Sequence, residues 1–165
     1  MAGPYVFPRE QWILTIANQT GGAARSGSWL GLAKYTRIGF LVYISQGDVA
    51  TTAITVDKAT ASTPSNQSTG ITLRNWWKCE DTATTVDTWS KGASATSITS
   101  SATGTGDSLY YVDVGADELG EHATAGLYDW VQVELGASHA SNRVCVLARL
   151  YDARYPKDVP LTALS

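Results

Sequence analysis

Apolar and polar residues alternate with a period of two along most of this chain. Successive side chains of a β-strand point to opposite faces of its sheet, so this alternation predicts strands with one face in a core. The clearest example is YTRIGFLVYIS, residues 35–45, which puts on one side Ile38, Phe40, Val42 and Ile44, and on the other Arg37, Gly39, Leu41 and Tyr43. Helix-like spacing is rare, and only the segment 115–126 leaves room for one short helical turn.

Strand-like segments recur between clusters of turn-forming residues. Besides 35–45 they are 11–18, 51–59, 71–80, 84–92, 108–115, 127–136 and 141–151, with a further short strand expected around Ile98. The Gly, Ser, Asn and Pro clusters that predict turns lie at 18–28, 45–48, 63–70 and 100–107. We therefore expect an all-β fold, either a two-sheet sandwich or a jelly roll, with eight to nine strands.

The two ends of the chain differ from its centre. A chain of 165 residues suits one domain. Neither end shows sustained alternation, and both carry prolines, which cannot continue a ladder of hydrogen bonds. We expect an N-terminal arm over residues 1–10, a β-sandwich domain over 11–151 and a C-terminal arm over 152–165.

Both predicted arms combine prolines with aromatic and basic side chains. Pro4 and Pro8 frame the segment PYVFP, and Pro156 closes the segment DARYP. Stiffened segments lose less conformational entropy when they dock than flexible ones do. We expect the arms to attach the protein to a partner through Tyr5, Phe7, Arg154 and Tyr155.

The charge balance argues against two kinds of partner. The net charge is −3 and the isoelectric point is about 5.2, so the chain lacks the basic footprint of a nucleic-acid-binding protein. It has no run of about 18 or more apolar residues, so we expect no membrane span. The first residues lack the basic region and apolar stretch of a secretory signal, which favours a protein that stays in the compartment where it is made.

Residues able to perform chemistry are scattered. His122 and His139 lie in loop-like contexts, and no nucleophile elbow, P-loop or dinucleotide-binding motif occurs. The acidic residues between 113 and 121 lack the register of a calcium loop. Cys79 and Cys145 lack metal-ligand spacing, so we expect free thiols, with one disulfide as the alternative. We expect no enzymatic activity, no metal and no cofactor.

Aromatic residues are abundant, with six tryptophans and eight tyrosines. Several large side chains fall opposite the predicted core, where a partner or the chain's own loops would cover them. The outward residues for which we expect a contact with another subunit are Leu41, Tyr43, Trp130, Leu147, Arg149 and Tyr151. Trp76 and Trp77 are adjacent and must point to opposite faces of a strand.

Three segments of the second half resemble a known family. They are DSLYYVDVGADELGEH, LYDWVQVELG and NRVCVLARLYDARYP, within which VDVGADEL and LYDARYP are the most specific parts. They resemble the small virion proteins of tailed bacteriophages known as head decoration, cement or minor structural proteins. The central segment RNWWKCEDTATTVDTWSKG is more aromatic than the family pattern.

The resemblance implies a non-enzymatic protein of the capsid surface, made in the host cytoplasm. Its partners would be the major capsid protein and further copies of itself, with no nucleic acid and no membrane. From the outward side chains we expect these copies to form a trimer. The resemblance does not decide whether the protein is located at the head, the neck or the tail of the virion. The competing hypothesis is a carbohydrate-binding sandwich, monomeric, in which a sugar stacks on Trp76, Trp77, Trp89 or Trp130.

Overall fold

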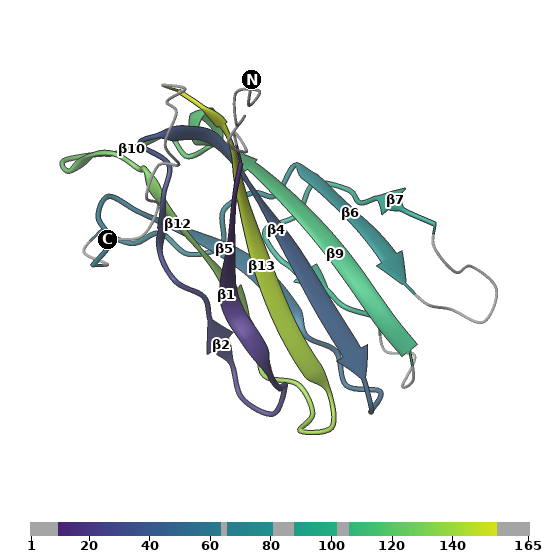
Figure 1. The fold of residues 1–165 in the computed structure, drawn as a ribbon. Coiled ribbons are helices and arrows are strands. Elements are labelled where there is room, and N and C mark those ends of the chain that lie inside the picture. The colour runs from purple at the N-terminus through teal and green to yellow at the C-terminus, as the bar shows by residue number, and fades with distance from the viewer. Residues whose placement is uncertain (1–9, 64–65, 81–87, 102–105, 155–165) are drawn as a thin grey trace, which may run out of the picture.

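The computed structural model describes residues 10–63, 66–80, 88–101 and 106–154. Strands form nearly all of its regular structure, and they build two antiparallel sheets packed face to face (Figure 1). The predicted all-β sandwich is therefore confirmed. No helix within the described ranges is long and apolar enough to cross a membrane.

The larger sheet has six strands and lies nearest the viewer in Figure 1. Every neighbouring pair in it is antiparallel. In spatial order the strands are β1 (Gln11–Thr20), β13 (Arg143–Ala153), β4 (Tyr35–Gln46), β9 (Gly106–Gly115), β6 (Asn75–Glu80) and β7 (Ser90–Lys91). The first and last strands, β1 and β13, are thus neighbours, and β13 lies between β1 and β4.

The second sheet is smaller and covers the inner face of the first. It consists of β2 (Arg25–Ser26), β12 (Trp130–Leu135), β5 (Ala53–Ala59) and β8 (Ile98–Thr99), with β3 (Leu30–Gly31) also paired to β12. A separate hairpin joins β10 (Glu121–His122) to β11 (Gly126–Leu127). One 3₁₀ turn, η1 (Ala116–Glu118), follows β9, inside the segment where the sequence left room for a helical turn.

The core fills the space between the two sheets. The residues predicted for the inner face of β4 are fully buried, namely Ile38, Phe40, Val42 and Ile44. Facing them from the second sheet are Ile54, Val56, Val131, Val133 and Leu135, all at most 1% exposed. Alternation therefore predicted correctly which side of β4, β5, β9, β12 and β13 faces inward.

Several strand boundaries differ from the predictions. The strand expected over 71–80 begins only at Asn75, because the residues before it pair with the second sheet: the Ile71 amide donates to the Val56 carbonyl at 2.9 Å. Of the strand expected over 84–92, the structure describes only β7, and 84–87 lie outside the described residues. The described chain begins at Glu10 and ends at Arg154, so nearly all of both predicted arms lies outside it.

Candidate functional site: the outer face of the large sheet

The register of the large sheet aligns five apolar side chains into one row on its outer face. The pairings connect β1, β13, β4, β9 and β6 at the same level. Along this row lie Leu14, Leu147, Leu41, Tyr111 and Trp77. The last four sit opposite the core-facing sets of their own strands, and Leu14 lies opposite the partly buried Ile13, ahead of the register shift in β1.

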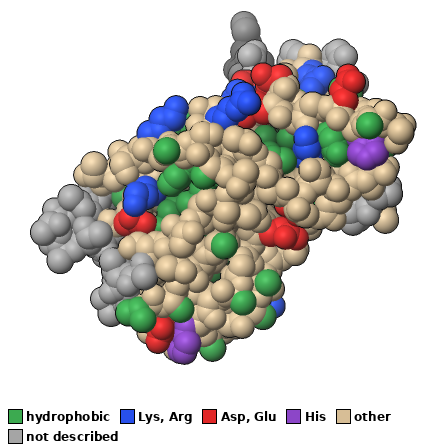
Figure 2. Space-filling model, turned by 180° about the vertical axis from the view of Figure 1, so that it is seen from behind, with side chains coloured by type: hydrophobic (Ala, Val, Ile, Leu, Met, Phe, Trp, Pro, Cys, Tyr) green, Lys and Arg blue, Asp and Glu red, His purple; other side chains and the backbone are tan. Residues whose placement is uncertain are grey.

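A second row runs beside the first, one step along the strands. It contains Cys145, Tyr43, Leu109 and Cys79. The term "apolar face" is used below for these two rows together with Trp12 and Trp89. Trp12 is 54% exposed, Leu14 56% and Trp89 46%, and the remaining members are half-buried against one another. On the reverse side of the molecule, apolar side chains are scattered among polar ones and backbone (Figure 2).

The apolar face contains a cavity of about 280 Å³ lined by Leu41, Trp77, Trp89 and Tyr111. The Trp77 and Tyr111 rings lie 6.1 Å apart, centroid to centroid, and are tilted by 41°. The Lys91 ammonium lies 5.6 Å from the centroid of the Trp77 ring. Three aromatic walls and one leucine make this cavity suited to an apolar side chain or to the apolar face of a ring.

The close approach of Tyr111 depends on a glycine in the neighbouring strand. Gly39 pairs with Asp113, and the Tyr111 side chain lies across it. A Cβ atom added at Gly39 would stand 2.1 Å from the Tyr111 hydroxyl oxygen. The absence of a side chain at residue 39 therefore allows Tyr111 to lie flat against the sheet, beside the cavity.

A charged cluster closes one end of the apolar face. The Arg37 guanidinium donates to the Asp113 carboxylate, with Nη2 and Oδ2 2.5 Å apart, and the Tyr151 hydroxyl donates to Asp113 Oδ1 at 2.6 Å. Burial raises the pKa of Tyr151, and the hydrogen bond to Asp113 raises it further. The cluster joins β4, β9 and β13, and it neutralises its own charges.

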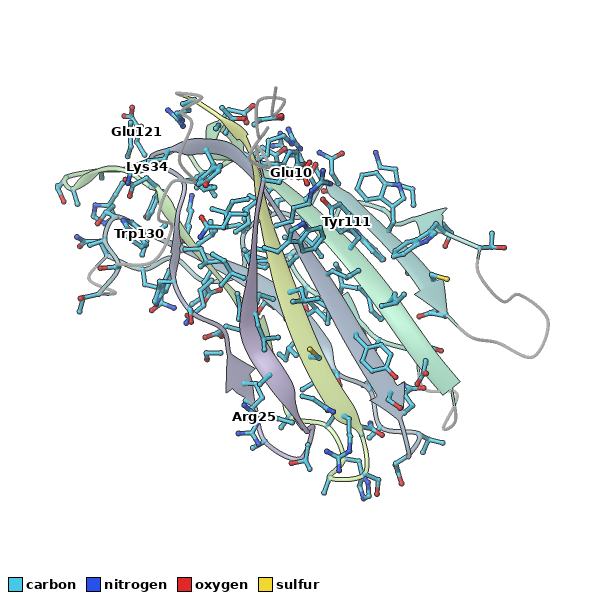
Figure 3. The ribbon with its side chains drawn as sticks, viewed as in Figure 1. Glu10, Arg25, Lys34, Tyr111, Glu121 and Trp130 are labelled. Carbon is cyan, nitrogen blue, oxygen red and sulfur yellow. The ribbon has the colours of Figure 1, made fainter. Side chains whose placement is uncertain are left out.

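Arg149 forms a second ion pair at the same end. Its Nε atom donates to Glu10 Oε2 at 3.0 Å, and the hydrogen bond from Arg149 holds the pKa of Glu10 below its ordinary value. The guanidinium also lies 4.7 Å from the centroid of the Tyr151 ring and 5.9 Å from that of Trp12. Figure 3 shows Glu10 and Tyr111 over the large sheet and Trp130 well away from both.

The structure brings together most of the outward residues predicted from the sequence. Leu41, Tyr43, Leu147, Arg149 and Tyr151 lie on two adjacent strands of one face. Trp130 does not join them, because β12 belongs to the second sheet, where its ring packs 3.3 Å from the position of a Cβ on Gly31.

The remaining predicted residues lie at or beyond the ends of the described chain. Arg154 follows β13 and donates from Nε to the Tyr35 carbonyl at 3.3 Å. Tyr5, Phe7 and Tyr155 lie outside the described residues.

Six members of the apolar face were given no contact or binding role by the sequence analysis, namely Trp12, Leu14, Cys79, Leu109, Tyr111 and Cys145. For two of them the signal was present, since alternation in QWILTIAN sets Trp12 and Leu14 opposite the partly buried Ile13. Of the tryptophans considered for sugar stacking, Trp77 and Trp89 share the cavity, whereas Trp76 packs against the core.

The residues considered as catalytic groups or metal ligands do not come together in the fold. His122 accepts hydrogen bonds from its own turn, and His139 Nδ1 lies 3.7 Å from a carboxylate oxygen of Asp48. Within the described ranges, no three His, Cys, Asp or Glu side chains gather as metal ligands. Cys79 and Cys145 are free thiols, as predicted, and three strand spacings, about 14 Å, separate them.

Comparisons with known proteins give distant likenesses. No family model and no curated protein matches the chain. The solved structure of the SPBc2 prophage-derived protein YomS is similar over 86% of this chain and 91% of its own, at 11% identity and a TM-score of 0.43. Two structures of infectious bursal disease virus, strains Gx and Gt, give TM-scores of 0.23 and 0.24. Likeness with TM-scores below 0.5 does not transfer a function.

Proposed function

We propose that this protein is a non-enzymatic structural protein of a tailed-phage virion that decorates the capsid and stabilises it by clamping major capsid protein subunits. The proposal rests on the positions of the two segments in which the resemblance to the virion proteins is most specific. VDVGADEL runs from the last residues of β9 through η1, and LYDARYP begins in the last residues of β13. The cluster of Arg37, Asp113 and Tyr151 ties them together at one end of the large sheet.

Both predicted arms leave the described structure at that same end. Glu10 is held by Arg149 on the outer face, and the Arg154 amide donates to the Lys34 carbonyl at 3.0 Å. Two chain ends anchored side by side could reach one partner together. This placement supports attachment through the aromatic anchors Tyr5, Phe7 and Tyr155, with charges such as Arg154 adding only about 0–1 kcal/mol each.

Deleting the arms tests the proposal. Removal of residues 1–8, or of 157–165, is expected to leave the circular dichroism spectrum and the melting temperature nearly unchanged, because neither segment shows the sustained alternation that predicts a core strand. The same deletions are expected to lower occupancy on purified capsids, measured by sedimentation and gel densitometry. Full occupancy by both truncated proteins would count against attachment through the arms. Labelled protein bound only at necks or tails would show that the protein attaches there and not to the capsid.

A second candidate, binding of a carbohydrate, is supported by the cavity between Trp77, Trp89 and Tyr111. A sugar ring can stack its apolar face on an aromatic ring. Under this candidate, a glycan array would identify a ligand, and Trp89→Ala would weaken its binding by about tenfold or more while Trp130→Ala would not. Absence of glycan binding by the intact protein would remove this candidate.

A further inference from the structure

We infer that the apolar face packs against the same face of a second copy of this chain, around a two-fold axis that runs along β4. The inference goes beyond the proposed function, since such a dimer would form whether or not a capsid is present. It differs from the trimer expected from the sequence. Three features of the face support it: its charges, its shape and its size.

The charges on the strands flanking β4 have opposite signs. On the outer face, β13 carries Arg143 and Arg149, and β9 carries Asp107 and Asp113. Each pair lies at one level, since Arg143 and Asp107 both pair with Ser45, and Arg149 and Asp113 both pair with Gly39. A two-fold rotation about β4 exchanges the positions of β13 and β9. At the first level Arg143 therefore faces Asp107 of the copy. At the second level Arg149 faces Asp113 of the copy, but both already have partners in their own chain, Glu10 and Arg37.

The residues on the axis are compatible with this arrangement. Gly39, Leu41, Tyr43 and Ser45 of β4 would each meet their own counterparts. Arg37 would also meet itself, but the Asp113 carboxylate of its own chain already balances that charge. No charge on the axis is left facing a like charge without a counter-ion.

The same rotation matches protruding residues with the cavity. It places β1 of one copy over β6 of the other, because both strands lie two positions from β4. Leu14 and Trp77 occupy the same level, so the exposed Leu14 arrives over the cavity wall formed by Trp77. Such an isologous contact is made twice, once by each copy. It gives the exposed leucine an apolar site and gives the cavity an apolar occupant.

The size of the face suits a stable dimer. Its strands have 10, 11, 12, 10, 6 and 2 residues, so at about 3.3 Å per residue and about 4.8 Å between strands the outer face of the large sheet, apolar centre and polar rim together, measures about 800 Å². Specific interfaces bury about 800 Å² on each partner, with an apolar centre and a polar rim. Here Leu41 and Tyr43 lie at the centre, with Arg143 and Asp107 at the rim. Aligned packing at about 10 Å is the usual way for two sheets to stack.

Analytical ultracentrifugation of the full chain tests the dimer. We expect the wild-type protein to sediment at twice the monomer mass, and Leu14→Glu to raise the dissociation constant by about 30-fold or more. Leu127→Glu is the matched control, because Leu127 is also exposed, at 65%, but lies in the β10–β11 hairpin. This control is expected to leave the dimer unchanged.

Charge reversal at the rim gives a test that does not depend on core packing. Arg143→Asp or Asp107→Arg alone is expected to weaken the dimer about tenfold at low salt, because each places like charges opposite one another twice. The double variant restores opposite signs and is expected to recover most of the affinity. A wild-type protein that stays monomeric, a trimer, or a dimer indifferent to Leu14→Glu and to both reversals would overturn the inference. Capsid occupancy is measured separately, so failure of one proposal does not imply failure of the other.

Discussion

Asn142→Ala is expected to lower the free energy of unfolding by about 3 kcal/mol, because Asn142 is fully buried and uses its whole amide group. Its Oδ1 atom accepts from the amides of Gly47 and Asp48 at 2.9 and 3.0 Å. Its Nδ2 atom donates to the Ala50 carbonyl at 3.0 Å and to Ser138 Oγ at 2.8 Å. Alanine would leave these partners without the amide and open a small void between the loop after β4 and the loop before β13.

Urea titration of the purified variant measures this loss, and Ser138→Ala is its control. Ser138 also joins the two loops but contributes only its hydroxyl, which donates to the Ala50 carbonyl at 3.1 Å. We expect this change to cost about 1 kcal/mol. If Asn142→Ala proved no more costly than Ser138→Ala, the buried amide would not be what ties the loops together.

Asn142 also shows a kind of contact that the sequence alone does not predict. The sequence SHASNRV predicts a turn before a strand, and nothing in it indicates that residue 142 holds a loop about ninety residues away. Alternation reports which side of a strand is apolar, and it placed Phe40 and Val42 correctly in the core. Hydrogen bonds between distant loops have no local pattern, so only the folded chain reveals them.

The residues of the candidate site could likewise be predicted only in part from the sequence. Alternation identified Leu41, Tyr43, Leu147 and Tyr151 as outward-facing, but it could not say that β13 lies beside β4. Trp130 met the same criterion and belongs to the other sheet. Whether a side chain faces the core or the outside is a local property of its strand, whereas the sheet to which a strand belongs depends on pairing between distant segments. The opposite charges of β13 and β9 therefore become visible only once strand order is known.

Raising the pH above 10 is expected to destabilise the fold through Tyr110. This side chain is fully buried, donates its hydroxyl proton to Glu80 and accepts from the Ser101 amide at 3.0 Å. Burial raises the pKa of Tyr110 above its ordinary value of about 10, and the hydrogen bond to Glu80 raises it further. Tyr151 is shifted in the same direction, by burial and by Asp113, but is less buried and should contribute less.

The sign follows from linkage between ionisation and folding. Above pH 10 the unfolded chain loses the Tyr110 proton while the folded chain keeps it, so the unfolded state gains stability as the pH rises. A tyrosine that stays protonated in the fold would cost up to about 2.7 kcal/mol at pH 12, at 1.36 kcal/mol per pH unit above 10. Stability from this group is complete below pH 10 and falls as the pH approaches the raised pKa. Urea titrations between pH 8 and pH 12 measure the loss, and absorbance at the phenolate band follows the ionisation.

Tyr110→Phe separates this tyrosine from the other groups that titrate at alkaline pH. The variant is expected to be less stable than wild type near pH 8, because Phe leaves the Ser101 amide without its acceptor. Its stability should then fall less steeply above pH 10, since the group responsible for part of the slope is gone. The lysines and the exposed tyrosines titrate in both proteins and cancel in the comparison. Equal slopes for the two proteins would mean that the Tyr110 proton is lost as readily in the fold as in the unfolded chain, contrary to its burial and its bond to Glu80.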